Sequence, residues 1–235
     1  MATETITWKG RFGPMDLKVG PATFRPSTIS TLLADALHFK PGSVVIDVGC
    51  GSGILSIIAA KLGASRVYGV DAADETVDVA SANAAAHGVG DRIMFAQGDM
   101  FDPLDSGIEA DVVIGDVSGI PDDIANVSGW FPSGLSGGPT GAELPMRMIE
   151  ESKRLLRQGG RLFLPTGSLQ DESSILDKAR SVYGSLKQLT ERSIPLPSTL
   201  AEDPAVLKML KEKVIALTQR GSRFQWTARV WEVTA

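Results

Sequence analysis

One ten-residue stretch, residues 44–53 (VVIDVGCGSG), constrains the fold more than any other part of the chain. Four of its first five residues are Val or Ile, a run typical of a strand buried on both faces of a parallel sheet. Glycines then stand at every second position, where they let the backbone turn sharply and approach a ligand closely. Residues 54–62 (ILSIIAAKL) follow with the composition of a helix. The sequence therefore predicts a strand, a tight glycine loop and a helix N-terminus, which together form a nucleotide pocket.

The spacing of these glycines distinguishes between the nucleotide-binding motifs. Gly49, Gly51 and Gly53 follow the pattern G-x-G-x-G, whereas a dinucleotide fingerprint reads G-x-G-x-x-G. Ile54 stands where the third glycine of that fingerprint would fall, which argues against an NAD-dependent oxidoreductase. The P-loop pattern G-x-x-x-x-G-K-[ST] does not occur in the chain, so a P-loop nucleotidase is excluded.

Two further predicted strands lead to carboxylates. The strand at 66–70 is followed by Asp71, and an acidic residue there can accept hydrogen bonds from both hydroxyls of a ribose. The next strand leads to Asp99 and Met100, whose carboxylate and backbone N–H can bind the amino group and a ring nitrogen of adenine. Because parallel strands separated by helices end at one edge of a sheet, we expect these residues to lie with Asp47 around an adenosine group.

The combined pattern resembles that of class I S-adenosylmethionine (SAM) methyltransferases, whose glycine loop reads D-x-G-x-G-x-G, here residues 47–53. The resemblance implies that SAM is the cofactor and that no metal is needed. The residues predicted to bind the cofactor are Asp47, Gly49, Cys50, Gly51, Gly53, Asp71, Ala72, Asp99, Met100 and Asp116. Cys50 is interpreted as a small packed residue of the loop rather than as a reactive thiol.

Residues 19–166 are also similar to one branch of this class, the HemK-like glutamine methyltransferases that modify peptide-release factors. The segments that carry the similarity are Phe24-Arg25-Pro26-Ser27-Thr28, residues 120–125 (IPDDIA), residues 137–141 (GGPTG) and residues 156–162 (LRQGGRL). Two features depart from that branch. Its N-P-P-Y tetrad is replaced by residues 116–119 (DVSG), and we expect the separate N-terminal domain that grips the protein substrate to be missing.

The acceptor is expected beyond the strand at 111–115, because ligands of open α/β sheets bind beyond the carboxyl ends of the strands. Asp116 occupies the position that matches the amide-holding Asn of HemK-like enzymes. An ionised carboxylate only accepts hydrogen bonds, so Asp116 is suited to an acceptor with N–H groups and can take the released proton. A turn-forming role is the alternative. Asp116 is thus the predicted catalytic residue, and the predicted substrate-binding residues are Val117, Ser118, Trp130, Phe131 and Phe24.

Residues 128–138 form a predicted loop that contains Trp130 and Phe131. Long glycine-containing loops beside a site often act as lids, with aromatic side chains as their contacts. Packing of Trp130 against the helix inserted near the C-terminus is the alternative interpretation. His38 and His87 are the only histidines and stand near predicted helix ends, so a histidine general base is not expected.

Composition excludes several other classes. The net charge is −5 and no run of basic residues exceeds two, which argues against nucleic-acid partners. A single cysteine excludes an internal disulfide and a CxxC metal site. The chain has neither an apolar stretch of about 18 residues nor a signal-like N-terminus, so we expect a cytoplasmic protein without membrane contact. The oligomeric state stays open.

The predicted fold class is α/β, a Rossmann-like doubly wound seven-stranded sheet with an antiparallel last strand and a helix inserted before it. We expect one domain, residues 1–235, made of an N-terminal cap (1–40), a cofactor-binding core (41–185) and a C-terminal strand pair (186–235). Helices are predicted at 28–39, 54–62, 74–87, 142–157, 171–183 and 204–219, and strands at 44–48, 66–70, 92–97, 111–115, 161–165, 186–194 and 224–231.

The predicted function is methyl transfer from SAM to a nitrogen of a small amine-bearing or heterocyclic metabolite. A HemK-like protein N-methyltransferase is the alternative within enzymes. A SAM-binding regulator without catalysis is the alternative from another class, because the N-P-P-Y tetrad is absent.

Overall fold

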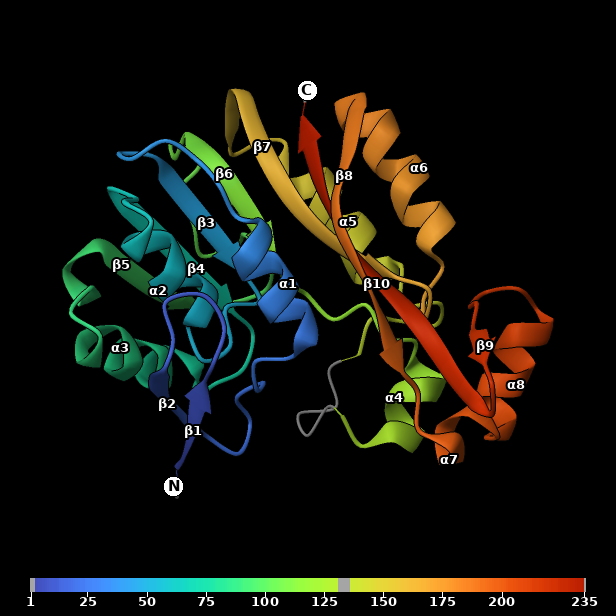
Figure 1. Cartoon of the computed structure of the whole chain (residues 1–235). Helices are drawn as coiled ribbons and strands as arrows, with labels where there is room; N and C mark the ends of the chain where they lie inside the picture. Colours follow the sequence, from blue (N-terminus) through green and yellow to red (C-terminus); the bar gives the residue numbers. More distant parts are fainter. Residues whose placement is uncertain (1–2, 131–135, 235) are drawn as a thin grey trace.

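A computed structural model describes residues 3–130 and 136–234 of the chain. Its centre is a twisted sheet whose main path runs β5-β4-β3-β6-β7-β10-β8 (Figure 1). The first five of these strands are parallel to one another, and β10 is antiparallel to both of its neighbours. The strands are β5 (Ile93–Gln97), β4 (Arg66–Asp71), β3 (Val44–Val48), β6 (Ala110–Gly115), β7 (Leu156–Gly167), β10 (Arg223–Thr234) and β8 (Ser185–Pro195). The predicted fold class is confirmed.

Two hydrophobic layers cover the two faces of this sheet. Successive side chains of a strand point to opposite faces, so Val45 packs in one layer and Ile46 in the other. The first layer holds α1 (Thr28–Ala36), α2 (Ile54–Lys61) and α3 (Thr76–Ala86), and the second holds α5 (Glu143–Ser152) and α6 (Glu172–Tyr183). A short helix, η1 (Gly90–Arg92), leads into β5. Helices on both faces of a mostly parallel sheet make the architecture doubly wound.

The N-terminal cap contains a hairpin that the sequence analysis did not predict. Strands β1 (Glu4–Trp8) and β2 (Met15–Val19) pair antiparallel and lie beside α3 (Figure 1). Trp8 and Leu17 are buried in the first layer, and the amide of Asn83 on α3 bonds to the backbone of Lys18. The hairpin is therefore anchored on the helix layer next to the glycine loop.

A third hydrophobic cluster fills the space beyond the ends of β6, β7 and β8. It is formed by α4 (Asp122–Ser128), α7 (Ser198–Ala201) and α8 (Pro204–Lys211), with β9 (Thr218–Arg220) paired to the start of β10 (Figure 1). Trp130 and Trp226 pack against this cluster from the sheet side. Among the residues that the structure describes, no helix has the length and apolarity needed to cross a membrane.

Three predicted helices were too long, and the helix predicted at 28–39 ends at Ala36. The inserted helix ends at Lys211 instead of continuing to 219, because Lys213 adopts a positive φ of 61° and Thr218–Arg220 pair with β10. The predicted start of that helix is confirmed, since Asp203 accepts a hydrogen bond from the N–H of Ala205. The helix predicted at 142–157 ends at Ser152, because Leu156 pairs with Ala110 and begins β7.

Candidate functional site

A cavity of about 790 Å³ lies at the carboxyl ends of the parallel strands. It is lined by the ends of β3, β4, β6 and β7, by residues 20–25 and 27–29 of the N-terminal segment, and by Trp130 and Trp226. Its volume is within the range of sites that enclose a cofactor-sized ligand. The position beyond the carboxyl ends of the strands is the one that open α/β sheets use for ligand binding.

The glycine loop between β3 and α2 borders this cavity, and its first glycine, Gly49, is part of the lining. Gly49, Gly51 and Gly53 have φ angles of +76°, +50° and +79°, a region that L side chains rarely adopt. A Cβ atom on Gly49 would also lie 2.7 Å from the backbone oxygen of Asp116, so glycine is required there for a close approach. The N–H groups of Gly49 and Cys50 donate to the carbonyl of Val70, at 2.8 and 3.0 Å. The loop is thereby fixed against the end of β4.

Asp71 ends β4 and faces the cavity beside this loop. Its Oδ2 accepts a hydrogen bond from the N–H of Gly51 and its Oδ1 one from the N–H of Ala73, both at 2.9 Å. A carboxylate has about four lone-pair sites, so both oxygens keep capacity for further donors such as ribose hydroxyls. Ala72 lines the cavity next to Asp71. The backbone thus holds the carboxylate in one orientation without using up its accepting capacity.

Asp99 and Met100 form the far end of the same wall. Both line the cavity, and Met100 has a positive φ of 49°, so the chain turns sharply after β5. Asp99 Oδ2 accepts a hydrogen bond of 2.7 Å from Arg147 on α5. Arg147 also donates to Glu151 at 2.6 Å. The sequence analysis missed Arg147, which orients the Asp99 carboxylate at the mouth of the proposed adenine site.

Asp47 lies deeper than the sequence suggested, whereas Cys50 is packed as the sequence analysis interpreted it and, like Asp47, does not line the cavity. Asp47 is fully buried under the loop and is not among the residues that line the cavity; Gly51 and Gly53 also lie outside the lining. Burial raises the pKa of Asp47 to about 7, although a 2.6 Å hydrogen bond from Ser56 opposes that rise. Burial also raises the pKa of the Cys50 thiol well above its ordinary value, in keeping with a packed side chain rather than a nucleophile.

Asp116 stands at the end of β6, where the cavity passes from the glycine loop to its other half. The hydroxyl of Ser30, near the start of α1, donates to Asp116 Oδ2 at 2.8 Å. Burial raises the pKa of Asp116 to about 6, and the bond from Ser30 opposes this rise. No other described residue donates a hydrogen bond to this carboxylate. Ser30, which the sequence analysis missed, therefore fixes one oxygen of the predicted catalytic group.

The other half of the cavity contains most of the predicted substrate-binding residues. Val117, Ser118 and Trp130 line it, and Trp130 also packs against the third hydrophobic cluster, whereas Phe24 lines the cavity beside Gly51 of the glycine loop. Trp130 therefore packs as the alternative interpretation expected and also borders the cavity, while the lid role of its loop stays a prediction. Phe131 lies outside the described residues. Lining residues that the sequence analysis missed are Thr166, Leu169, Gln170, Ile194, Pro195 and Trp226.

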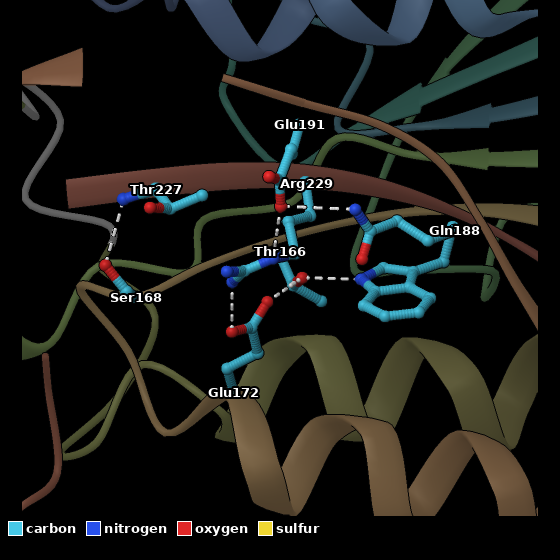
Figure 2. A network of polar contacts seen from close by, with 8 residues as sticks. Thr166, Ser168, Glu172, Gln188, Glu191, Thr227 and Arg229 are labelled. Atoms are coloured by element: carbon cyan, nitrogen blue, oxygen red, sulfur yellow. Dashed lines mark hydrogen bonds and ion pairs between the residues drawn. The ribbon is translucent and has the colours of Figure 1, made fainter. Parts of the chain in front are cut away.

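A polar network supports the floor of the cavity at the end of β7 (Figure 2). Thr166 lines the cavity, donates to Glu172 at 2.6 Å and accepts from the indole N–H of Trp231 at 2.8 Å. Glu172 in turn accepts from Arg229 at 2.6 Å, and Arg229 also bonds to Glu191 at 3.2 Å. The network joins β7, β8, β10 and α6, so the cavity floor is tied to three strands of the sheet and to one helix that covers it.

The cofactor implied by the sequence fits this cavity. Gly49 lines the cavity with a positive φ that an L side chain would strain, and Asp71 presents accepting oxygens beside it. Thr23, on the opposite segment, has a buried hydroxyl with no hydrogen-bond partner among the described residues. Within residues 3–130 and 136–234, no three His, Cys, Asp or Glu side chains are arranged to hold a metal ion. A polar, nucleoside-type cofactor is the group that these features accommodate.

Comparison with known proteins agrees with this assignment. A family model described as "Ribosomal protein L11 methyltransferase (PrmA)" matches residues 26–120. The ribosomal protein L11 methyltransferase of Anoxybacillus flavithermus is 33% identical over 145 residues, 62% of this chain and 38% of the relative. The release factor glutamine methyltransferase of Moorella thermoacetica is 30% identical over 189 residues, 76% of this chain and 66% of the relative. The chain thus spans 38% of the length of the first of these relatives.

A solved structure shares the fold. The crystal structure of a ribosomal protein L11 methylase from Lactobacillus delbrueckii subsp. bulgaricus superposes with a TM-score of 0.53 at 20% identity, covering 88% of this chain and 78% of that one. The fold, the glycine-loop site and the matched sequences place this chain among the class I SAM-dependent methyltransferases. The class and the cofactor predicted from the sequence are confirmed.

Proposed function

We propose that this chain transfers the methyl group of SAM to a nitrogen atom of a protein side chain. The names of the matched relatives state protein acceptors, ribosomal protein L11 and a release factor. They favour a protein acceptor over the small amine-bearing or heterocyclic metabolite that the sequence predicted. The acceptor atom is a nitrogen, as the sequence predicted, but it belongs to a protein side chain and not to a small metabolite.

The position of Asp116 carries this proposal. Its carboxylate lines the cavity next to Gly49 and is held at one oxygen by Ser30. An ionised carboxylate offers only acceptor sites, so it orients a substrate group that carries N–H rather than one that carries lone pairs alone. The neighbouring Val117 and Ser118 supply a carbonyl and a hydroxyl on the same strand end.

The reaction needs little from the protein beyond placement and proton acceptance. When bound, SAM supplies an electrophilic methyl group on a sulfonium. The apolar wall formed by Trp130, Ile194 and Trp226 excludes water from the acceptor, which leaves the nitrogen unsolvated and aligned for in-line attack. The pKa of Asp116, about 6, lies close to neutral pH, where a base combines a large ionised fraction with a useful affinity for the proton.

Transfer of labelled methyl groups tests the proposal. The purified enzyme is incubated with methyl-labelled SAM and with fractions of a cell extract that separate proteins, nucleic acids and small molecules. We expect the label in protein, at an amide or amine nitrogen located by mass spectrometry, and we expect its loss with Asp116→Ala. Label in the small-molecule fraction would instead support the metabolite acceptor, and SAM binding without transfer to any fraction would support a regulator.

A further inference from the structure

We infer that Gln170 is a specificity-determining residue for the methyl acceptor, because its side-chain amide borders the cavity with an unpaired Nε2 and needs only a turn about its terminal torsion to donate to an oxygen atom of the substrate. This inference rests on the proposed methyl transfer. Gln170 lies between the end of β7 and the start of α6, in a segment without any recognised motif. It lines the same cavity as Asp116.

The amide of Gln170 is buried without a partner. The residue is only 7% exposed, and its Nε2 has no hydrogen-bond partner among the described residues. An unpaired buried amide N–H costs free energy, so native structures pair the large majority of buried side-chain polar groups. The exception here falls on a residue that lines the proposed acceptor site. Ser118, on the facing strand end, likewise has a buried hydroxyl with no partner in the described part of the chain.

The position of this amide is set by a glycine. A Cβ atom on Gly119 would lie 2.3 Å from Oε1 and 3.3 Å from Nε2 of Gln170, so the amide lies against the backbone of Gly119. Gly119 is three residues beyond Asp116 and also lines the cavity. The donor of Gln170 and the acceptor of Asp116 therefore belong to one continuous wall.

The surroundings make this donor selective. Around it the cavity is largely apolar, with Ile120, Leu169, Ile194 and Trp226 in the lining. In such a site a substrate group that leaves the Gln170 N–H unpaired binds less tightly, because no water molecule replaces the missing hydrogen-bond acceptor. A donor at Gln170 together with an acceptor at Asp116 complements a group with both a carbonyl oxygen and N–H. An alkylammonium group provides only N–H.

Two small probes separate these possibilities. The enzyme is saturated with S-adenosylhomocysteine, and binding of propionamide and of propylamine is measured by ligand-observed NMR. We expect Gln170→Leu to weaken propionamide binding about five- to tenfold, with propylamine and S-adenosylhomocysteine affinities within twofold of the wild type. Removing an unpaired buried amide is also expected to raise the melting temperature by about 2–4 °C. A purely structural role for Gln170 would lower it.

Two further variants keep the test specific. Gly119→Ala places a methyl group against the Gln170 amide at a residue without positive φ, so it is expected to weaken propionamide binding without the gain in melting temperature. Gln188→Leu is the matched control, because Gln188 is exposed and its Nε2 already donates to Glu191 at 3.2 Å (Figure 2). It is expected to leave the binding of both probes unchanged.

The outcomes also separate this inference from the proposed function. If the wild type fails to bind S-adenosylhomocysteine, the methyl-transfer proposal fails and this inference falls with it. If the wild type binds it, but propionamide binds Gln170→Leu as tightly as the wild type, only the role of Gln170 is overturned. Selective loss of propionamide in both cavity variants supports that role.

Discussion

The buried carboxyl group of Asp47 makes a contribution to the stability of this protein that falls as the pH rises toward neutrality. Its pKa is raised from 3.8 to about 7, chiefly by burial, and the nearby Asp116 raises it further. Between these two values the folded chain binds more protons than the unfolded chain, so the free energy of unfolding decreases with increasing pH. A difference of about three pH units corresponds to a destabilisation on the order of 4 kcal/mol, fully present above about pH 7.

Asp47→Asn removes the charge and nearly preserves the shape. The amide oxygen of Asn can still accept the hydrogen bond from Ser56, and its NH₂ replaces Oδ1, which already lacks a partner among the described residues. Below about pH 4 both side chains are neutral, so we expect nearly equal stability of the variant and the wild type. At pH 8 we expect the variant to be more stable by about 2–4 kcal/mol.

Urea unfolding at pH 4, 5, 6, 7 and 8 measures this difference. Asp35→Asn is the matched control, because it removes an exposed carboxylate and should leave the pH dependence of the wild type nearly unchanged. Unfolding free energies of Asp47→Asn and wild type that differ by the same amount at every pH would refute the reasoning. Such a result would mean that Asp47 stays ionised in the folded protein at low cost.

Three other predictions concern the site. Asp71→Ala removes the carboxylate that faces the proposed ribose position, so affinity for S-adenosylhomocysteine should fall about ten- to a hundredfold by calorimetry; unchanged affinity in a folded variant would contradict this role. Asp116→Asn keeps an accepting oxygen for Ser30 but takes up a proton poorly, so the rate of methyl transfer should fall about 10²- to 10⁴-fold while SAM affinity stays within about threefold. A near-normal rate with Asp116→Asn, together with loss of activity in Asp116→Ala, would mean that Asp116 only orients the substrate. Methyl transfer should also be unaffected by EDTA, since no described cluster of side chains has metal-ligand geometry; activity lost with EDTA and restored by magnesium would disprove this.

The cofactor half of the cavity could be predicted from the sequence because each of its parts is encoded locally. A buried strand, a glycine loop and a helix follow one another within residues 44–62, and the observed bounds of β3 and α2 differ from the predicted ones by at most one residue. The positive φ angles of the loop glycines are a property of single residues. Such features do not depend on which distant segment packs against them.

Elements that depend on distant pairing were predicted less well. Leu155 and Leu156 continue the apolar periodicity of α5, yet their backbone bonds to Ala110 and extends the ladder between β6 and β7. Val214 and Leu217 likewise fit a helical stripe and still contact the third hydrophobic cluster, although α8 ends at Lys211. Helical periodicity identified which side chains are apolar contacts, but the sheet partner decided the backbone conformation.

The residues of the proposed acceptor half of the cavity could be predicted less well from the sequence than those of the cofactor half. The wall of the acceptor half combines Gly119 after β6, Gln170 after β7 and Trp226 in β10, which are neighbours only because β7 lies between β6 and β10 in the sheet. None of these residues stands in a pattern that chemistry requires at a fixed spacing. An unpaired amide can be recognised only when its surroundings are known. Gln188, a glutamine on an exposed strand, donates to Glu191, whereas the buried Nε2 of Gln170 has no partner among the described residues. Sheet order therefore decides which residues border the proposed acceptor, and candidates for selecting it are found by asking which buried polar groups the fold leaves unpaired.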